Sequence, residues 1–333
     1  MPFTLSHPAF AVPLRRLLPG ELALPGLVLG SMAPDLEYFA RMEAVGTIGH
    51  RYAGFLLLGL PLGIALCCAY LFVIRPALPG FMPSIGRLRE YVQAHARYRK
   101  PLAPLDWLFF VLAAHAGYAT HIFVDAWTHR SGWFVRHIAP LRQPVMGDYW
   151  FQWLQYLTSL IGAALIGAWL LVNWLRWRGG DEAHRQPRSG SGLDYGYIGL
   201  WLGATAVGLL VLLVKLNGDW LSPRLAVWTV APFSAAAVGI YAVSILVMTG
   251  RVRQWGFGLS VVVLLLAVLW AFKLGILPFA AAKLGMKLLP VERWIGTIWT
   301  FSAAILFISI HTNRIVKEFV RIGLKTVNNR TLL

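Results

Sequence analysis

The chain has 333 residues, of which 58% are hydrophobic and only 13% are charged, and its mean hydropathy is +0.62. Soluble domains carry roughly 25% charged residues, so this composition excludes an ordinary soluble domain and predicts a polytopic membrane protein. The formal net charge of +16 would suit a nucleic-acid-binding protein. The cations are spread along the chain beside apolar segments, however, so we expect contact with the lipid bilayer and its anionic headgroups, and no nucleic acid.

Residues 1–50 contain no uninterrupted apolar run of the roughly 20 residues that a transmembrane helix needs. Prolines divide this segment, so we expect short helices packed against one end of the spans that follow. Pro34 is suited to begin a helix and places Asp35 and Glu37 in its first turn. That position is favourable for a carboxylate in itself; the alternative is that the break in the helix directs Asp35 towards a functional site.

Apolar segments then recur to the end of the chain. Together with the short N-terminal helices they predict an all-α polytopic membrane protein with about seven transmembrane helices. The predicted spans are 52–74, 105–127, 150–174, 195–214, 225–248, 255–277 and 294–311. Ionisable residues are sparse inside the later spans. We therefore interpret residues 1–149 as a metal-site module and residues 150–333 as a scaffold of membrane helices.

Ionisable residues cluster at the end of the second predicted span. His121 and Asp125 are four residues apart, so they share one face of a helix, and His129 extends that face by another turn. Imidazole and carboxylate at this spacing can chelate a cation, and ionisable groups in a membrane helix are costly unless they have a function. The alternative is a polar helix end at the water interface, with Asp125 paired to an arginine.

The polar residues of the first module fall on one side of the membrane. His7, Asp35 and His50 precede the first span, while Asp125 ends the second span. Imidazoles and carboxylates brought together in this way could hold one or two cations. Mixed nitrogen and oxygen ligands without thiolate favour zinc, with manganese and iron as alternatives.

The connections on the opposite side carry the larger share of the 30 Lys and Arg residues. Cytoplasmic loops are enriched in these residues, so the pattern predicts that the polar side faces away from the cytoplasm. The expected location is a bacterial inner (plasma) membrane.

Three motifs carry a family resemblance: Met1-Pro-Phe-Thr-Leu-Ser-His7-Pro, Gly30-Ser-Met-Ala-Pro-Asp35-Leu-Glu-Tyr-Phe39 and Asp125-Ala-Trp-Thr-His129-Arg-Ser-Gly-Trp133. They resemble the bacterial membrane family labelled domain of unknown function 4184, over residues 1 to about 175. That family implies a membrane fold and no assigned activity.

More distantly, the order of His, Pro-Asp and His-x-x-x-Asp is similar to that of membrane-bound metal-dependent hydrolases. These in turn resemble the zinc-dependent phospholipase C and single-strand nuclease group. The resemblance implies the metal ligands His7, Asp35, His50, His121 and Asp125. The chain departs from these hydrolases at Glu37, where they carry Asp, and after His50, where Arg51-Tyr52 replaces a second His and a hydroxyl residue.

The leading functional hypothesis is a membrane-embedded metal-dependent hydrolase of phosphoesters, including lipid phosphoesters. In this hypothesis the metal activates water, Glu37 acts as a base and Arg130 steadies the phosphate. The alternative is a non-catalytic integral membrane protein in which the polar cluster has a structural or transport role.

Overall fold

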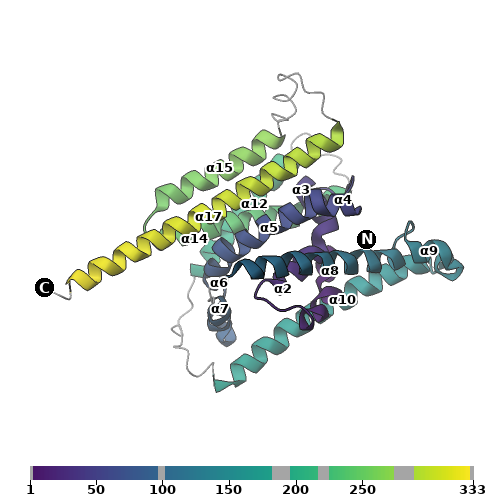
Figure 1. The fold of residues 1–333 in the computed structure, drawn as a ribbon, viewed down its shortest axis with the longest axis horizontal. Helices are drawn as coiled ribbons and strands as arrows, with labels where there is room; N and C mark the ends of the chain where they lie inside the picture. The colour runs from purple at the N-terminus through teal and green to yellow at the C-terminus, as the bar shows by residue number, and fades with distance from the viewer. Residues whose placement is uncertain (1–2, 97–101, 182–195, 217–224, 274–288, 331–333) are drawn as a thin grey trace. The chain divides into compact units, whose positions relative to one another are not determined.

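The computed structural model describes residues 3–96, 102–181, 196–216, 225–273 and 289–330. The predicted all-α class is confirmed (Figure 1). Within these residues the only strands are β1 (Pro144–Val145) and β2 (Asp148–Tyr149), which form one short antiparallel hairpin.

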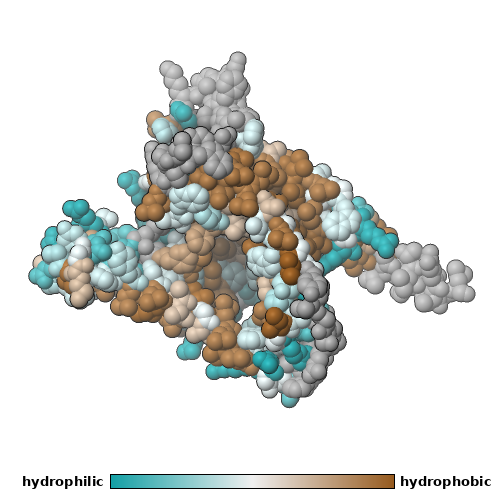
Figure 2. Space-filling model, turned by 180° about the vertical axis from the view of Figure 1, so that it is seen from behind, coloured by the Kyte–Doolittle hydropathy of each residue, from teal (hydrophilic) through white to brown (hydrophobic). Residues whose placement is uncertain are grey.

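Six helical segments in the described residues are long and apolar enough to cross a membrane: Tyr52–Phe81, Pro104–His137, Trp150–Gly179, Gly196–Leu216, Leu225–Gly250 and Pro290–Ile322. Another apolar helix, Trp255–Ala271, is shorter. Large apolar side chains remain exposed on these helices, including Leu160 and Leu165 on one of them, and Figure 2 shows wide apolar areas on the face that it presents. The chain is therefore a multi-pass membrane protein.

The long helices are α8 (Pro104–Thr128), α10 (Trp150–Gly179), α12 (Gly196–Leu216), α14 (Ala231–Gly250), α15 (Trp255–Lys273) and α17 (Pro290–Arg330). The shorter helices that follow the first span are η6 (Ile85–Arg87), α7 (Leu88–Ala96), α9 (Trp133–His137), η7 (Ala139–Arg142) and α13 (Leu225–Trp228).

The first span is built from five consecutive pieces: α4 (Tyr52–Gly54), η4 (Phe55–Gly59), α5 (Leu60–Ala69), η5 (Tyr70–Ile74) and α6 (Arg75–Phe81). Both η4 and η5 are π-helical turns, and each ends two residues before a proline, Pro61 or Pro76. Proline cannot donate the usual helical hydrogen bond and crowds the preceding turn, and the wider π turn accommodates it without breaking the span.

The N-terminal region forms short helices, as the prolines predict: η1 (Thr4–Ser6), α1 (Pro8–Ala11), η2 (Val12–Arg16), α2 (Ala23–Met32), η3 (Ala33–Asp35) and α3 (Leu36–Arg41). The longest, α2, packs along α8 (Figure 1). A Cβ at Gly26 would overlap the Phe110 carbonyl, and a Cβ at Gly30 would overlap the Ala114 carbonyl. Small residues therefore let the two backbones approach closely, as in other membrane helix pairs.

The described chain divides into two compact units that interleave in sequence. Unit 1 comprises Met1–Glu37, Gly46–Gly63 and Arg99–Gly179, and unit 2 comprises Tyr38–Val45, Ile64–Tyr98 and Gly180–Leu333. The predicted division at residue 149 stays a prediction. Unit 2 has an apolar core to which η5, α14, α15 and α17 all contribute, with Val73, Ile245 and Ile308 among its buried side chains.

Candidate metal centre

The contact between α2 and α8 determines how His121 is held. Gly117 on α8 lies against Leu27 and Ser31 of α2, with no room for a Cβ. One turn further along α8, the buried His121 places its Nδ1 2.6 Å from the Ser31 carbonyl oxygen. A carbonyl can only accept, so Nδ1–H donates this bond. The bond fixes the ring orientation and directs Nε2 away from Ser31, as outer hydrogen bonds do for metal-binding histidines.

A second outer hydrogen bond orients Asp35, the last residue of η3. The Thr4 hydroxyl donates to Asp35 Oδ2 over 2.6 Å, and both residues are buried. Asp35 Oδ1 is buried with no hydrogen-bond partner. Burial raises the pKa of Asp35, while His121 and the Thr4 bond act in the opposite direction. A neighbouring cation would stabilise the charged carboxylate in this buried position.

Glu37 holds the loop that carries His50. Its Oε1 accepts bonds from the backbone N–H and the hydroxyl of Thr47, and its Oε2 accepts a 3.0 Å bond from the Gly49 N–H. Gly49 also lies so close to the Pro34 carbonyl that a Cβ would not fit. The buried carboxylate of Glu37 thus fixes the two residues that lead into His50.

Four side-chain atoms from three parts of the chain converge on one point. His50 Nε2 lies 3.4 Å from Asp35 Oδ1 and 3.3 Å from Asp125 Oδ2. His121 Nε2 lies 3.2 Å from Asp125 Oδ2 and 4.0 Å from Asp35 Oδ1. Ligands held tetrahedrally at about 2.0–2.1 Å from a zinc ion are roughly 3.3–3.4 Å apart. The cluster therefore has the spacing to hold a metal ion.

Ion pairs between an imidazolium and the carboxylates are the alternative explanation of these distances. His121 already donates Nδ1–H to Ser31, so a neutral His121 presents an Nε2 lone pair to the carboxylate of Asp125. Two lone pairs at 3.2 Å repel each other unless a proton or a cation lies between them. A proton or a cation must therefore lie between these two atoms, and a divalent cation could serve His50, His121 and Asp125 together.

His7 adds a third buried imidazole. Its ring stacks on His121 with a centroid distance of 3.8 Å, and its Nε2 lies 3.7 Å from Asp125 Oδ1. Both ring nitrogens are buried without a hydrogen-bond partner. Burial, reinforced by the nearby His121, lowers the pKa of His7 to about 3, so the ring is neutral and retains a lone pair. Two overlapping groups could hold a metal: His7, Asp35 and His121, or His50, His121 and Asp125.

All five residues predicted as ligands therefore lie in one cluster, although their role as ligands stays a prediction. His129, which the helical stripe includes but the predicted ligand set does not, places Nδ1 3.3 Å from Asp125 Oδ1. Arg130 is exposed just beyond α8 and has no hydrogen bond or ion pair with any described residue. The predicted roles of Glu37 as a base and of Arg130 at the phosphate stay predictions; the bonds of Glu37 are those of a residue that holds a loop.

Sequence reasoning missed the outer groups that orient the cluster. Thr4 and Ser31 both lie in motifs that carry the family resemblance, but nothing in the sequence indicates which hydroxyl or carbonyl faces a ligand. The predicted ligands differ in exposure. The His50 side chain is 36% exposed, compared with 10% for Asp125 and 0% for His121.

One family model matches residues 1–310, and it is described as Domain of unknown function (DUF4184). No curated protein matches the chain, and no solved structure matches it.

Proposed function

Since the chain belongs to the family described as Domain of unknown function (DUF4184), whose description assigns no activity, we propose a function from the geometry: a membrane-embedded, metal-dependent hydrolase of phosphoesters. The observation that carries the proposal is the convergence of His50, His121, Asp35 and Asp125. Such a convergence of buried ionisable groups beside a membrane helix is costly unless a cation or a function accompanies it.

The donor set decides which metal we propose. Imidazole nitrogens and carboxylate oxygens without thiolate suit zinc, with manganese and iron as the alternatives. A bound divalent ion would supply an activated water and polarise the phosphoryl oxygen. In the hydrolysis, water adds to phosphorus, the ester P–O bond breaks, and the alcohol leaves with a proton.

We propose that the substrate reaches the cluster beside His50. His50 is the exposed ligand, whereas the other predicted ligands, on α8 and in the N-terminal helices, are buried. Arg130 follows α8 immediately after His129 and is exposed to the surroundings. A guanidinium there is suited to steady a phosphate that approaches beside His50.

One observation favours a structural role as the second candidate. If His50, His121, Asp35 and Asp125 all bind one ion, four protein ligands complete a tetrahedral shell, as in structural zinc sites. A catalytic site needs a position for water, which three ligands leave vacant. Turnover and stability therefore separate the two candidates.

The proposal is tested with purified protein in detergent. Phosphomonoester, phosphodiester and phospholipid substrates should be hydrolysed in a chelator-sensitive way, and added zinc should restore the activity. His121→Ala should abolish turnover, whereas His115→Ala, in the same helix but bonded only to the Val111 carbonyl and packed on Phe55, should retain it. Bound metal with no turnover, and unfolding on chelation, would favour the structural role. Absence of metal contradicts both.

We also propose that the protein resides in the bacterial plasma membrane with the cluster on the extracytoplasmic side, because the opposite side carries more Lys and Arg. In intact cells, cysteine at Arg142 should react with an impermeant thiol reagent, while cysteine at Arg253 should not. The native Cys67 and Cys68 are buried, so they give little background. The reverse pattern would place the cluster in the cytoplasm.

A further inference from the structure

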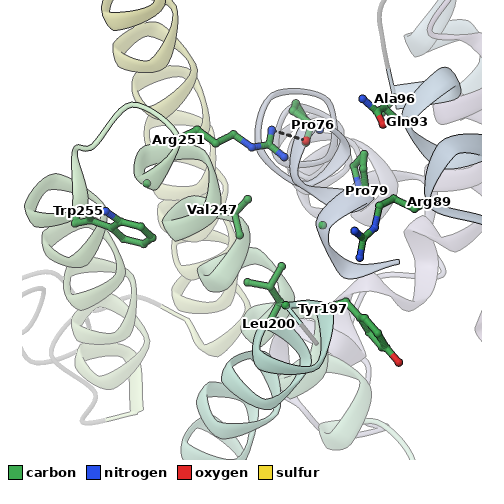
Figure 3. Close-up of a pocket in the computed structure, with 13 residues that line it drawn as sticks. Pro76, Pro79, Arg89, Gln93, Ala96, Tyr197, Leu200, Val247, Arg251 and Trp255 are labelled. Atoms are coloured by element: carbon green, nitrogen blue, oxygen red, sulfur yellow. Dashed lines mark hydrogen bonds between the residues drawn. The ribbon is translucent and has the colours of Figure 1, made fainter. Parts of the chain in front are cut away.

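Unit 2 contains a cavity of about 840 Å³ whose lining comes from α6, α7, α12, α14 and α15 (Figure 3). Its polar lining consists of Arg89 and Gln93 on α7, Tyr197 on α12, Arg251 just after α14 and Trp255 on α15. The described residues that line it include two guanidinium groups and no carboxylate. The described lining therefore contributes two guanidinium groups, and the cavity volume lies within the size range of small-molecule sites, roughly 300–1,000 Å³.

Each arginine donates a hydrogen bond to a backbone carbonyl of α6 or of the residue that follows it. Arg251 Nη1 donates to the Pro76 carbonyl over 2.8 Å, the dashed bond in Figure 3, and Arg89 Nε donates to the Met82 carbonyl over 2.9 Å. Arg251 makes its hydrogen bonds through Nη1 alone and has no carboxylate partner among the described residues. Its Nε and Nη2 donors are thus held in place and remain for an anion, which a guanidinium binds through paired hydrogen bonds.

The cavity lies at the ends of three candidate spans and of the shorter apolar helix α15. The first span ends at Phe81 and α14 ends at Gly250, while α12 begins at Gly196 and α15 begins at Trp255. Helix ends of this kind lie at the level of the lipid headgroups, where Trp and Tyr are enriched. Pro79, Leu200 and Val247 supply apolar lining beside the arginines. The cavity thus pairs fixed cations with an apolar wall at headgroup depth.

We propose that this cavity binds the phosphate of an anionic phospholipid, with Arg251 and Arg89 at the phosphate and with Leu200 and Val247 against the glycerol and the first acyl carbons. A lipid headgroup and free inorganic phosphate both offer a phosphate that the two arginines could bind. The apolar wall favours the lipid, because inorganic phosphate gains nothing from it. The inference is independent of the proposed hydrolase, since it uses no residue of the candidate metal centre.

The experiment uses the full chain in phosphatidylcholine nanodiscs with increasing phosphatidylglycerol. Bound anionic lipid is counted by native mass spectrometry, and thermal unfolding is followed in parallel. We expect phosphatidylglycerol to be retained and to raise the midpoint of unfolding, while millimolar inorganic phosphate should not. Arg251→Gln should weaken retention about tenfold, the effect of losing one charge-assisted contact. Arg253→Gln, which removes the same charge two residues away and does not line the cavity, should leave retention unchanged.

A second variant, Leu200→Trp, narrows the apolar part of the cavity without changing the charge and should also reduce retention, so the inference remains testable if Arg251→Gln folds poorly. Equal losses in Arg251→Gln and Arg253→Gln would indicate only general attraction to a cationic surface and would overturn the site. An equal effect of inorganic phosphate would overturn the lipid as occupant. Unchanged retention in Leu200→Trp would place the lipid elsewhere.

Discussion

The two units differ in the kind of buried polar group that they contain. In unit 2, the hydroxyls of Thr249, Ser302 and Ser309 donate to carbonyls four residues earlier in their own helices, and Tyr241 bonds Ser309. In unit 1, Asp35 Oδ1 and His121 Nε2 are buried without a hydrogen-bond partner and lie 4.0 Å apart. A helix can satisfy a hydroxyl from its own backbone, but it cannot satisfy converging imidazoles and carboxylates. Among the described residues, unit 2 also has buried hydroxyls without a hydrogen-bond partner, those of Ser244 and Thr312, but these are neutral. The two unpartnered atoms of unit 1 belong to ionisable groups and lie close together, which is the arrangement that a bound cation would stabilise.

The largest effect is expected from removal of His121, whose Nε2 faces both carboxylates. In His121→Ala, metal content should fall by more than the roughly 10–100-fold that outer residues cost. The measurement is metal stoichiometry of the purified variant. His115→Ala is the matched control in α8, and an equal loss there would show that the effect comes from the helix and not from the cluster.

The next effect comes from the contact between α2 and α8. Gly30→Ala places a methyl group on the Ala114 carbonyl, so α2 must move and Ser31 must withdraw from His121. We expect a loss of about 1–3 kcal/mol in the free energy of unfolding, together with weaker metal binding. Gly167→Ala is the control, because nothing lies within 4 Å of its added Cβ. Similar stability of the two variants would contradict close packing as the cause.

Glu37 is predicted to act on metal binding through the loop before His50. Glu37→Gln keeps the size of the side chain, but its amide NH₂ cannot accept bonds from both Thr47 and Gly49. Metal affinity should fall by about 10–100-fold, with a smaller loss in Glu37→Asp if the carboxylate still reaches the loop. If Glu37 were instead only a base, Glu37→Gln would lose turnover and keep its metal affinity, which competition with a chelator measures.

The smallest effect is expected at Thr4, which orients Asp35 through one hydrogen bond. Thr4→Val keeps the shape and removes the donor, so metal affinity should fall about tenfold, at the low end of outer-residue effects. Ser159→Ala, which removes the bonds of a hydroxyl to the Phe3 N–H and the Gln155 carbonyl and touches no predicted ligand, is the control in the same unit. A Thr4→Val variant with wild-type affinity would mean that Asp35 is held by packing alone.

The sequence predicts the membrane fold and the identity of the cluster more readily than it predicts how the cluster is held. Apolar length alone specifies the spans, and the high cost of buried His and Asp marks His121 and Asp125. The small residues Ala113, Ala114 and Gly117 indicate a close helix contact, but they do not identify α2 as the partner. The bonds from Thr47 and Gly49 to Glu37 depend on the direction of loop N–H groups, which residue types do not specify.

The cavity of unit 2 and the cluster of unit 1 should respond independently to mutation. If unit 2 binds anionic lipid through Arg251 while unit 1 binds a metal ion, the two units bind ligands of opposite charge. Loss of lipid retention in Arg251→Gln should leave the metal content unchanged, because the two sites share no residue. A coupled loss would mean that the variant disturbs the whole fold.

The most direct test of a cation-centred cluster is metal analysis of the wild-type protein combined with X-ray absorption spectroscopy. The account predicts about one equivalent of zinc, manganese or iron per chain, with only nitrogen and oxygen ligands, at about 2.0–2.2 Å if the metal is zinc. It also predicts that a chelator removes the metal and lowers the midpoint of thermal unfolding. Protein that contains no metal after gentle purification, takes up none on titration and unfolds at the same temperature with and without chelator would contradict it.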